Sequence, residues 1–304
     1  MDWQQAQKEL ITQLIPLYGD REAAVIADWT MENLSGWKKI DRLLHRSTQL
    51  PPETFDLYQK YSRELLAHRP VQYVLHESWF AGMKLYVDEN VLIPRPETEE
   101  LVEWAIQTTL SSPTPQSTPS APPSTGPSQS PEPPGSPIIL DVGTGSGCIA
   151  ITLALQLPGA QVHAVDISTG ALTVAGHNAQ NLQAPVRFHQ LDFLDPQQWP
   201  LLPQFTSIVS NPPYIPDSDK TTMAPHVLKS EPHLALFVPD NDPLLFYDAL
   251  ARFAKKHLSP RGFLFAEIHE ALGPAAVQLF RKAGFQEVIL RKDMQGNDRM
   301  IRAR

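Results

Sequence analysis

From about residue 138 to the C-terminus, short apolar runs alternate with segments of helical periodicity, and this alternation constrains the fold more than any other feature of the chain. It predicts an α/β fold, in which helices cover both faces of a mostly parallel sheet and ligands bind at the carboxyl ends of the strands. The last two strands are expected to form a closing hairpin that adds an antiparallel strand. The expected strands are 138–140, 161–165, 186–191, 207–209, 262–268, 286–290 and 299–302, and the expected helices are 148–157, 169–182, 243–257 and 274–283.

The first 70 residues have a different pattern. Their apolar residues recur at helical spacing, and glycine or proline interrupts the pattern at Gly19-Asp20, Ser35-Gly36 and Pro51-Pro52. Residues 1–70 are therefore predicted to form a small N-terminal helical-bundle domain.

Residues 71–95 are richer in β-forming side chains. Gln72–Val74 and the residues around Gly82 suggest a short hairpin, which is expected to link the helical bundle to a second domain over 96–304. That domain is expected to open with a helix over 97–107.

Residues 111–137 consist almost entirely of Pro, Ser, Thr and Gln, with ten prolines and no apolar periodicity. Such a segment buries too little apolar surface to offset the entropy of ordering, so we expect a disordered insertion. A proline-rich docking site is the alternative.

The composition excludes several classes of protein. The formal net charge of -8 and the pI near 5.7 give no overall basic field, so stable nucleic-acid binding is not expected. A single cysteine, Cys148, permits neither an intrachain disulfide nor a cysteine-rich metal site, and no metal is expected. Cys148 itself is either a packing residue or a reactive thiolate at a helix start. No signal peptide or membrane span is evident, so a cytoplasmic location is expected. Nothing in the sequence suggests an obligate interface, so a monomer is expected.

A glycine-rich turn follows the first strand of the second domain. The run after Ile138–Leu140 is Asp141, Val142, Gly143, Thr144, Gly145, Ser146 and Gly147, and a helix is expected next. Glycines let the backbone pass close to a ligand, and a helix N-terminus offers free N–H groups. A dinucleotide fingerprint, G-x-G-x-x-G, would need glycine in place of Cys148, so the spacing here is tighter.

Two further positions suit a nucleoside. Asp166 ends the second strand of this domain about twenty residues later and can accept hydrogen bonds from two ribose hydroxyls; alternatively it caps the next helix. Asp192 and Phe193 follow the third strand, where the carboxylate can bind an adenine amino group and the ring can cover a purine; Phe193 can equally be core packing.

The tetrapeptide Asn211-Pro212-Pro213-Tyr214 follows the apolar run from Phe205 to Val209. The Asn211 side-chain oxygen and the Pro212 carbonyl are two acceptors that can hold the N–H groups of a planar amide or arylamine. The prolines fix the backbone and remove competing donors, and Tyr214 offers a flat face to the planar group. This pattern indicates transfer of a group to a planar nitrogen, although an isolated Asn-Pro-Pro can also be a simple turn.

Together, the turn and the tetrapeptide resemble the class I S-adenosylmethionine-dependent methyltransferases, which are Rossmann-like with a seven-stranded sheet. The segments 69–74, 80–82 and 92–99 are similar to those that precede the catalytic domain in the HemK/PrmC family. That resemblance covers nearly the whole chain. It implies methylation of the glutamine side-chain amide nitrogen (N5) in the Gly-Gly-Gln motif of class 1 peptide-chain release factors, with S-adenosylmethionine as cofactor.

The resemblance also implies roles for individual residues. Asn211, Pro212 and Tyr214 are expected to be catalytic, and the whole tetrapeptide, Pro213 included, is expected to hold the glutamine. The N-terminal domain is expected to recognise the release factor. Cofactor contacts are expected from Gly143, Thr144, Gly145, Ser146, Gly147, Asp166, Phe193 and Asn211.

Three features depart from the family or are less specific. The family often has tryptophan at the position of Phe193, and it usually has a much shorter loop in place of residues 111–137. Arg95 and Glu97 either line the reaction pocket or form a structural salt bridge.

The alternatives are an amino methyltransferase acting on adenine or guanine, a non-catalytic adaptor that recruits partners, and an NAD-dependent oxidoreductase. The first shares the tetrapeptide chemistry, because an exocyclic base amine is also planar. The acidic charge and the linker sequence disfavour it. The intact motifs disfavour the adaptor, and the glycine spacing disfavours the oxidoreductase.

Overall fold

The structure is a computed structural model of the 304-residue chain, and it describes residues 1–111, 136–221, 223 and 225–304. Nearly all of the predicted insertion at 111–137 lies outside the described residues. The chain divides into two compact units. The first comprises residues 1–78, 87–89 and 223–231, and the second comprises residues 79–86, 90–222 and 232–304.

The first unit is helical, as its sequence predicts. Its long first helix starts with a capping box between Asp2 and Gln5, bends at Gly19, where φ is 74°, and ends at Gly36 in the left-handed conformation. These bends and ends confirm the predicted breaks. The helices are α1 (Trp3–Ser35), α2 (Lys39–Leu44), α3 (Pro52–Leu66), α4 (Val71–Leu75) and α8 (Pro225–Ser230).

A separate apolar core holds this unit together. Leu10 and Leu14 of α1 and Leu65 of α3 are fully buried in it. Two tyrosines tie α1 to α3 by hydrogen bonds to backbone carbonyls: Tyr58 donates to Ala6 over 3.0 Å, and Tyr18 donates to Leu65 over 3.1 Å.

The expectation of β structure at Gln72–Val74 is wrong, because Val71–Leu75 forms the short helix α4. The Pro70 carbonyl accepts hydrogen bonds from the backbone N–H groups of Tyr73 and Val74, both over 3.0 Å. Tyr73, Val74 and Leu75 are all buried, whereas a half-buried strand would expose every second side chain. The hairpin around Gly82 does form, as a two-stranded sheet of β1 (Ser78–Phe80) and β2 (Met83–Leu85).

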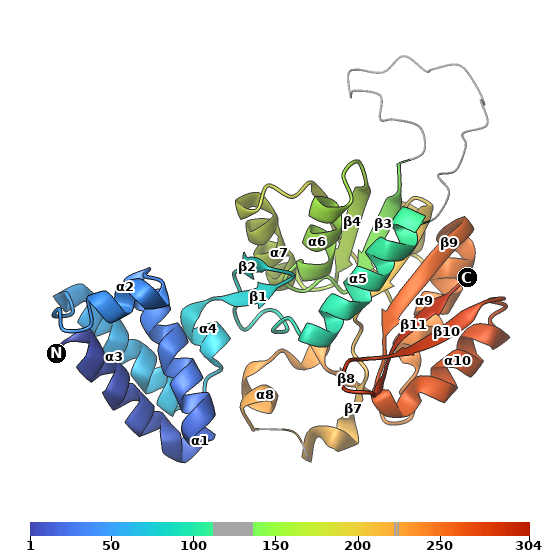
Figure 1. Cartoon of the computed structure of the whole chain (residues 1–304). Helices are drawn as coiled ribbons and strands as arrows, with labels where there is room; N and C mark the ends of the chain where they lie inside the picture. Colours follow the sequence, from blue (N-terminus) through green and yellow to red (C-terminus); the bar gives the residue numbers. More distant parts are fainter. Residues whose placement is uncertain (112–135, 222, 224) are drawn as a thin grey trace. The chain divides into compact units, whose positions relative to one another are not determined.

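The second unit is built on a seven-stranded sheet of order β10-β11-β9-β6-β3-β4-β5 (Figure 1). Only β11 runs against its neighbours, so the predicted closing hairpin and its antiparallel strand are confirmed. The strands are β3 (Ile138–Val142), β4 (Gln161–Asp166), β5 (Val186–Gln190), β6 (Phe205–Ser210), β9 (Leu258–Glu267), β10 (Val288–Lys292) and β11 (Asp298–Ala303).

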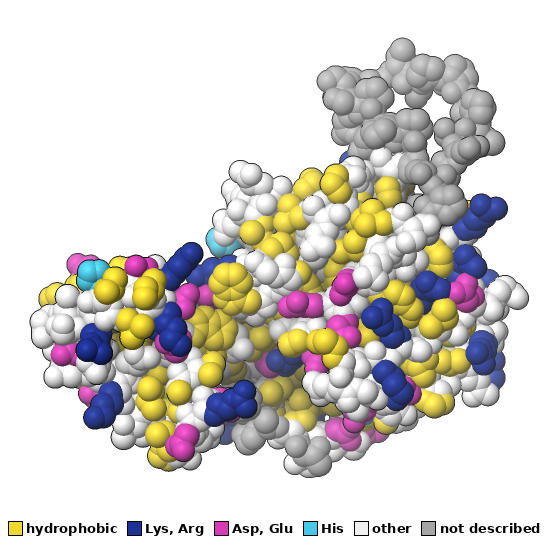
Figure 2. Space-filling model, viewed as in Figure 1, with side chains coloured by type: hydrophobic (Ala, Val, Ile, Leu, Met, Phe, Trp, Pro, Cys, Tyr) yellow, Lys and Arg dark blue, Asp and Glu magenta, His cyan; other side chains and the backbone are white. Residues whose placement is uncertain are grey.

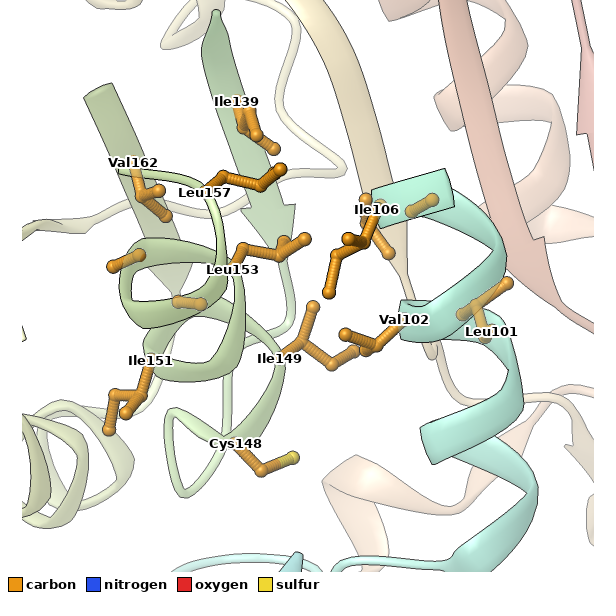
Figure 3. Close-up of a cluster of buried hydrophobic side chains, with 14 of the residues drawn as sticks. Leu101, Val102, Ile106, Ile139, Cys148, Ile149, Ile151, Leu153, Leu157 and Val162 are labelled. Atoms are coloured by element: carbon orange, nitrogen blue, oxygen red, sulfur yellow. The ribbon is translucent and has the colours of Figure 1, made fainter. Parts of the chain in front are cut away.

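Helices cover both faces of this sheet and form two cores. On one face, Val102 and Ile106 of α5 point toward Ile149 and Leu153 of α6, and Ile139 of β3 belongs to the same core (Figure 3). On the other face, α9 and α10 pack against the alternate side chains of the same strands. The helices are α5 (Pro96–Ser111), α6 (Cys148–Gln156), α7 (Thr169–Asn181), α9 (Leu245–His257) and α10 (Gly273–Lys282).

A second small sheet was not predicted. It pairs β7 (Ile215–Pro216), which directly follows the tetrapeptide, with β8 (Phe237–Val238) in parallel. The pairing ties the chain after Tyr214 to the segment that leads into α9. Within the described part of the chain, no helix combines the length and apolar character needed to cross a bilayer.

Candidate functional site

The residues predicted to form the site follow parallel strands at one edge of the sheet. The register pairs Val142 of β3 with Ser210 of β6, and Ser210 with Ala266 of β9. The residues that follow these three positions are Gly143, Asn211 and Glu267, so the glycine turn starts beside Asn211, and Asn211 lies beside Glu267. β3 lies between β4 and β6, where the strand order reverses, and such a position binds ligands in open α/β sheets.

The glycine turn has the backbone conformation that its sequence predicts. Gly143, Gly145 and Gly147 all have positive φ, at 73°, 54° and 83°. A Cβ placed on Gly143 or Gly145 would meet nothing within 4 Å among the described residues, so there is open space beside this backbone. A Cβ on Gly147 would lie 3.2 Å from that of Ala175, so this glycine permits close packing of α7.

Asp141 lies beneath the turn and is fully buried. Its Oδ2 accepts from the Thr144 hydroxyl over 2.6 Å and from the Ala150 backbone N–H over 3.2 Å. Burial raises the pKa of Asp141 to about 7. Among the described residues, Asp141 Oδ1 and Ser146 Oγ are buried without a hydrogen-bond partner.

Asp166 connects the glycine turn to the start of α7. Its two carboxylate oxygens accept from the backbone N–H groups of Gly145 and Ser168, each over 2.9 Å. Partial burial raises its pKa despite these bonds. The N-cap of α7 is Ser168, which accepts from the Ala171 N–H, so Asp166 does not itself cap the helix. Each carboxylate oxygen has a second lone pair, so the group can still accept from a ligand.

Phe193 lies mostly inside the core, with 6% of its surface exposed. Its ring centroid is 5.1 Å from that of Phe253 and 5.9 Å from that of Trp199. Asp192 accepts from the Leu194 backbone N–H over 2.9 Å. Phe193 therefore packs in the core, which is one of the two roles that the sequence allowed for it.

A chain of hydrogen bonds leads from the tetrapeptide to a buried acid. The Asn211 Nδ2 donates to the Thr98 hydroxyl over 3.0 Å, and this hydroxyl donates to Glu267 Oε2 over 2.6 Å. Glu267 is 1% exposed, and burial raises its pKa above the ordinary value of 4.5. The three residues come from α5, β9 and the loop after β6.

Tyr214 is held by the same acid. Its hydroxyl donates to Glu267 Oε1 over 2.9 Å, and its ring meets that of His269 at 6.0 Å in an edge-to-face arrangement. Burial, together with Glu267, raises the pKa of Tyr214 well above the ordinary range. Glu267 therefore fixes both ends of the tetrapeptide, one directly and one through Thr98.

The hydrogen bonds from Asn211 to Thr98 and from Thr98 to Glu267 determine which way the Asn211 amide faces. The Thr98 hydroxyl has one proton, and an ionised Glu267 can only accept it. Thr98 must then accept from Asn211, which directs Nδ2 toward Thr98 and leaves Oδ1 as a free acceptor. Among the described residues, no hydrogen bond is made to Asn211 Oδ1 or to the Pro212 carbonyl. Pro212 is buried, and Pro213 is half-buried beside it.

Sequence reasoning missed Thr98 and Glu267. It selected Arg95 and Glu97 from the same segment, but it is Thr98 that reaches Asn211, while Glu97 accepts from Gln295 Nε2 over 3.3 Å. The signal for Glu267 was an acid that directly follows the apolar run 263–266 at the carboxyl end of β9. Such an acid costs free energy unless it has partners.

Cys148 is a buried packing residue rather than a reactive thiolate. Its thiol is buried, and burial raises its pKa to about 12, so it stays protonated at neutral pH. Within the described ranges, no group of three or more His, Cys, Asp and Glu side chains is arranged to hold a metal ion.

Two domain families match the chain. Residues 132–235 match the methyltransferase small domain, and residues 5–75 match the PrmC N-terminal domain. The catalytic domain of hMettl16, in complex with the MAT2A 3'UTR hairpin 6, is similar in structure, with a TM-score of 0.51 and 15% identity. The structural match covers 82% of this chain and 81% of the hMettl16 chain. Sheet order, glycine turn and domain matches define a Rossmann-like class I methyltransferase.

The particular family follows from full-length relatives. The chain is 38% identical over 294 residues to a release factor glutamine methyltransferase of Flavobacterium psychrophilum, covering 97% of this chain and 96% of the relative. A protein of the same name from Chlorobaculum tepidum is 36% identical over 301 residues, covering 96% and 94%. The chain belongs to the release factor glutamine methyltransferase family.

Proposed function

We propose that this protein transfers a methyl group from S-adenosylmethionine to the side-chain amide nitrogen (N5) of the glutamine in the Gly-Gly-Gln motif of class 1 peptide-chain release factors. The names of its full-length relatives support this substrate. The orientation of the Asn211 amide carries the proposal, because it leaves an acceptor at the edge of the sheet where the glycine turn lies.

The residues at this edge fit S-adenosylmethionine. The open space beside Gly143 and Gly145 admits a ligand close to the backbone, and Asp166 has lone pairs for two ribose hydroxyls. Thr144, Ser146 and Gly147 complete the turn, and the exposed edge of Phe193 is the proposed purine contact. When bound, S-adenosylmethionine supplies an electrophilic methyl group on its sulfonium sulfur.

The tetrapeptide positions the glutamine. An amide nitrogen is a weak nucleophile because its lone pair is delocalised, so placement matters more than a strong base. In the proposed arrangement, one N–H donates to Asn211 Oδ1 and the other to the Pro212 carbonyl. Pro213 keeps the backbone rigid, and the Tyr214 ring lies against the amide plane. Methylation would break the S–CH3 bond and leave a neutral thioether, while the amide nitrogen would release one N–H proton to solvent. The product therefore keeps only one of these two hydrogen bonds.

The first unit is proposed to recognise the release factor, because it supplies none of the residues assigned to the cofactor or the amide. The cytoplasm is the proposed location, since release factors act on ribosomes. Arg95 and Glu97 are proposed to line the entrance to the reaction pocket.

A methyl-transfer assay with tritium-labelled S-adenosylmethionine tests the acceptor. We expect label on intact release factor and none on a variant in which the Gly-Gly-Gln glutamine is alanine. DNA and ribosomal RNA, which test the rival base methyltransferase, should stay unlabelled. Labelled nucleic acid together with unlabelled release factor would refute the proposed substrate.

A further inference from the structure

The helical unit contains a cavity of about 190 Å³ that none of the roles above uses. The cavity is lined by side chains of α1 and α2 and the residues next to them, and we call it the α1–α2 pocket. Trp3, Met31 and Leu43 give it apolar walls. Its volume is below the roughly 300 Å³ at which small-molecule sites begin, so it suits one or two side chains.

The pocket is basic, although the chain as a whole is acidic. Lys39, Arg42 and Arg46 line it, and Asp28 is the one acidic side chain among its lining residues. The Asp28 carboxylate already pairs with Arg42 over 2.8 Å. Lys39 and Arg46 make no ion pair with any described residue, so two positive charges at the pocket are unmatched.

Arg42 supplies a second, independent observation. Its side chain is only 9% exposed, and Nη1 donates to the Asp28 carboxylate and to its backbone carbonyl. The Glu32 carboxylate is 3.5 Å from Nη2, at the outer limit of a hydrogen bond. Within the described part of the chain, Nε is buried without an acceptor. A buried donor without a partner is costly, and a carboxylate is the acceptor that a guanidinium binds best.

The surface around the pocket is apolar. On α2, Ile40, Leu43 and Leu44 are each more than half exposed, which is unusual for three large side chains on one six-residue helix. Figure 2 shows hydrophobic and basic side chains next to one another on the visible face of this unit. Adjacent apolar and basic groups fit an acidic protein segment better than a nucleic-acid backbone, which offers phosphates without apolar contacts.

We propose that the α1–α2 pocket is a docking site for the protein substrate and takes an acidic side chain that lies beside an apolar one. This inference rests on the proposed function. A Gly-Gly-Gln motif presents few atoms to an active site, so a second, remote contact would raise the affinity for the intact protein without touching the reacting amide. Two linked contacts bind more tightly than either alone.

The test compares steady-state methylation of intact release factor and of a short Gly-Gly-Gln peptide by full-length variants. For Lys39→Glu/Arg46→Glu we expect KM for the intact protein to rise roughly tenfold or more, with kcat unchanged. Leu43→Ser should raise it by a smaller factor. Peptide methylation should match wild type in both variants. Raising the salt concentration should increase KM for wild type and have little effect on the double variant.

The matched control is Arg21→Glu/Arg63→Glu, which makes the same charge change on the same unit at exposed residues that do not line the pocket. The control should keep the wild-type KM. An equal KM for the pocket variant and the control would overturn the proposal, as would equal losses on protein and peptide. If Lys39→Glu/Arg46→Glu lost binding to RNA while its KM for intact release factor stayed unchanged, the pocket would be assigned to nucleic acid instead. Wild-type protein that methylates neither substrate would overturn the proposed function itself.

Discussion

The hydroxyl of Thr98 donates to Glu267 over 2.6 Å, although 169 positions separate the two residues along the chain. This bond commits the only proton of Thr98, so the hydroxyl must accept from Asn211. The orientation of the proposed catalytic amide thus depends on a threonine and a buried acid that have no direct contact with the substrate in the proposed arrangement.

Replacing Thr98 tests this dependence. Thr98→Val keeps the shape of the side chain but frees the Asn211 amide to rotate, so kcat should fall by roughly tenfold to a hundredfold with a smaller effect on KM. It should also destabilise the fold by about 1–3 kcal/mol, because Glu267 loses a buried donor. Thr98→Ser retains the hydroxyl and should restore most of kcat. Steady-state kinetics and urea unfolding of the two variants provide the measurement, and equal kcat values would contradict the positioning role.

The pH dependence of kcat tests Glu267. Burial raises its pKa above 4.5, and the hydrogen bonds from Thr98 and Tyr214 lower it in part. Because the carboxylate must be ionised to accept both protons, activity should be lost as pH falls through this pKa. Tyr214→Phe removes one of the bonds, so the pKa should rise further and activity should be lost at a higher pH. An unshifted acid limb in the pH profile of kcat would show that Glu267 does not control this step.

A histidine pair should make the fold sensitive to acid. His163 of β4 is 6% exposed, its Nδ1 lies 2.9 Å from Nε2 of His189, and burial and His189 lower its pKa from 6.5 to about 4. The unfolded chain binds a proton that the native state excludes, so stability should fall as pH drops from 6.5 toward 4, by at most about 3 kcal/mol.

The measurement is the urea midpoint at pH 7 and at pH 5. His163→Gln should lose less stability than wild type between these two values, because it removes one of the titrating rings. The same loss in both proteins would mean that other groups cause the acid sensitivity.

Two glycines of the turn should respond differently to alanine. Gly147→Ala places a methyl group against Ala175 at positive φ, so it should destabilise the fold by about 1–3 kcal/mol. Gly145→Ala carries a similar backbone cost, but its methyl group enters the space proposed for the cofactor. Gly145→Ala should therefore raise the dissociation constant for S-adenosylmethionine by a larger factor than Gly147→Ala. Calorimetric titration and thermal unfolding separate the two effects, and equal changes in affinity would refute the assignment of Gly145.

Much of the fold was predictable because its signals are local. The breaks at Gly19, Gly36 and Pro52 follow from backbone preferences, and the central parallel strands β3, β4 and β6 are short and at least half apolar. The strand prediction at residues 72–74 was wrong because it relied on Tyr and Val, which favour strands. In the structure, three consecutive buried side chains and hydrogen bonds to the Pro70 carbonyl stabilise a helical turn instead.

The site was predictable only in part. Asn211 belongs to a compact motif, and the structure places it at the expected edge of the sheet. Thr98 and Glu267 reach it only because α5 packs over the sheet and β9 lies beside β6, and no local pattern encodes either contact. The basic α1–α2 pocket likewise forms because Lys39, Arg42 and Arg46 lie beside side chains of α1. Helical spacing alone does not reveal this contact between two helices.

The most direct test of the proposed function is mass spectrometry of release factor after incubation with this protein and S-adenosylmethionine. Fragmentation of the peptide that contains Gly-Gly-Gln should locate one added methyl group on the glutamine side-chain amide, and Asn211→Ala should nearly abolish it. A methyl group on another residue, or equal modification by Asn211→Ala, would contradict the proposed reaction.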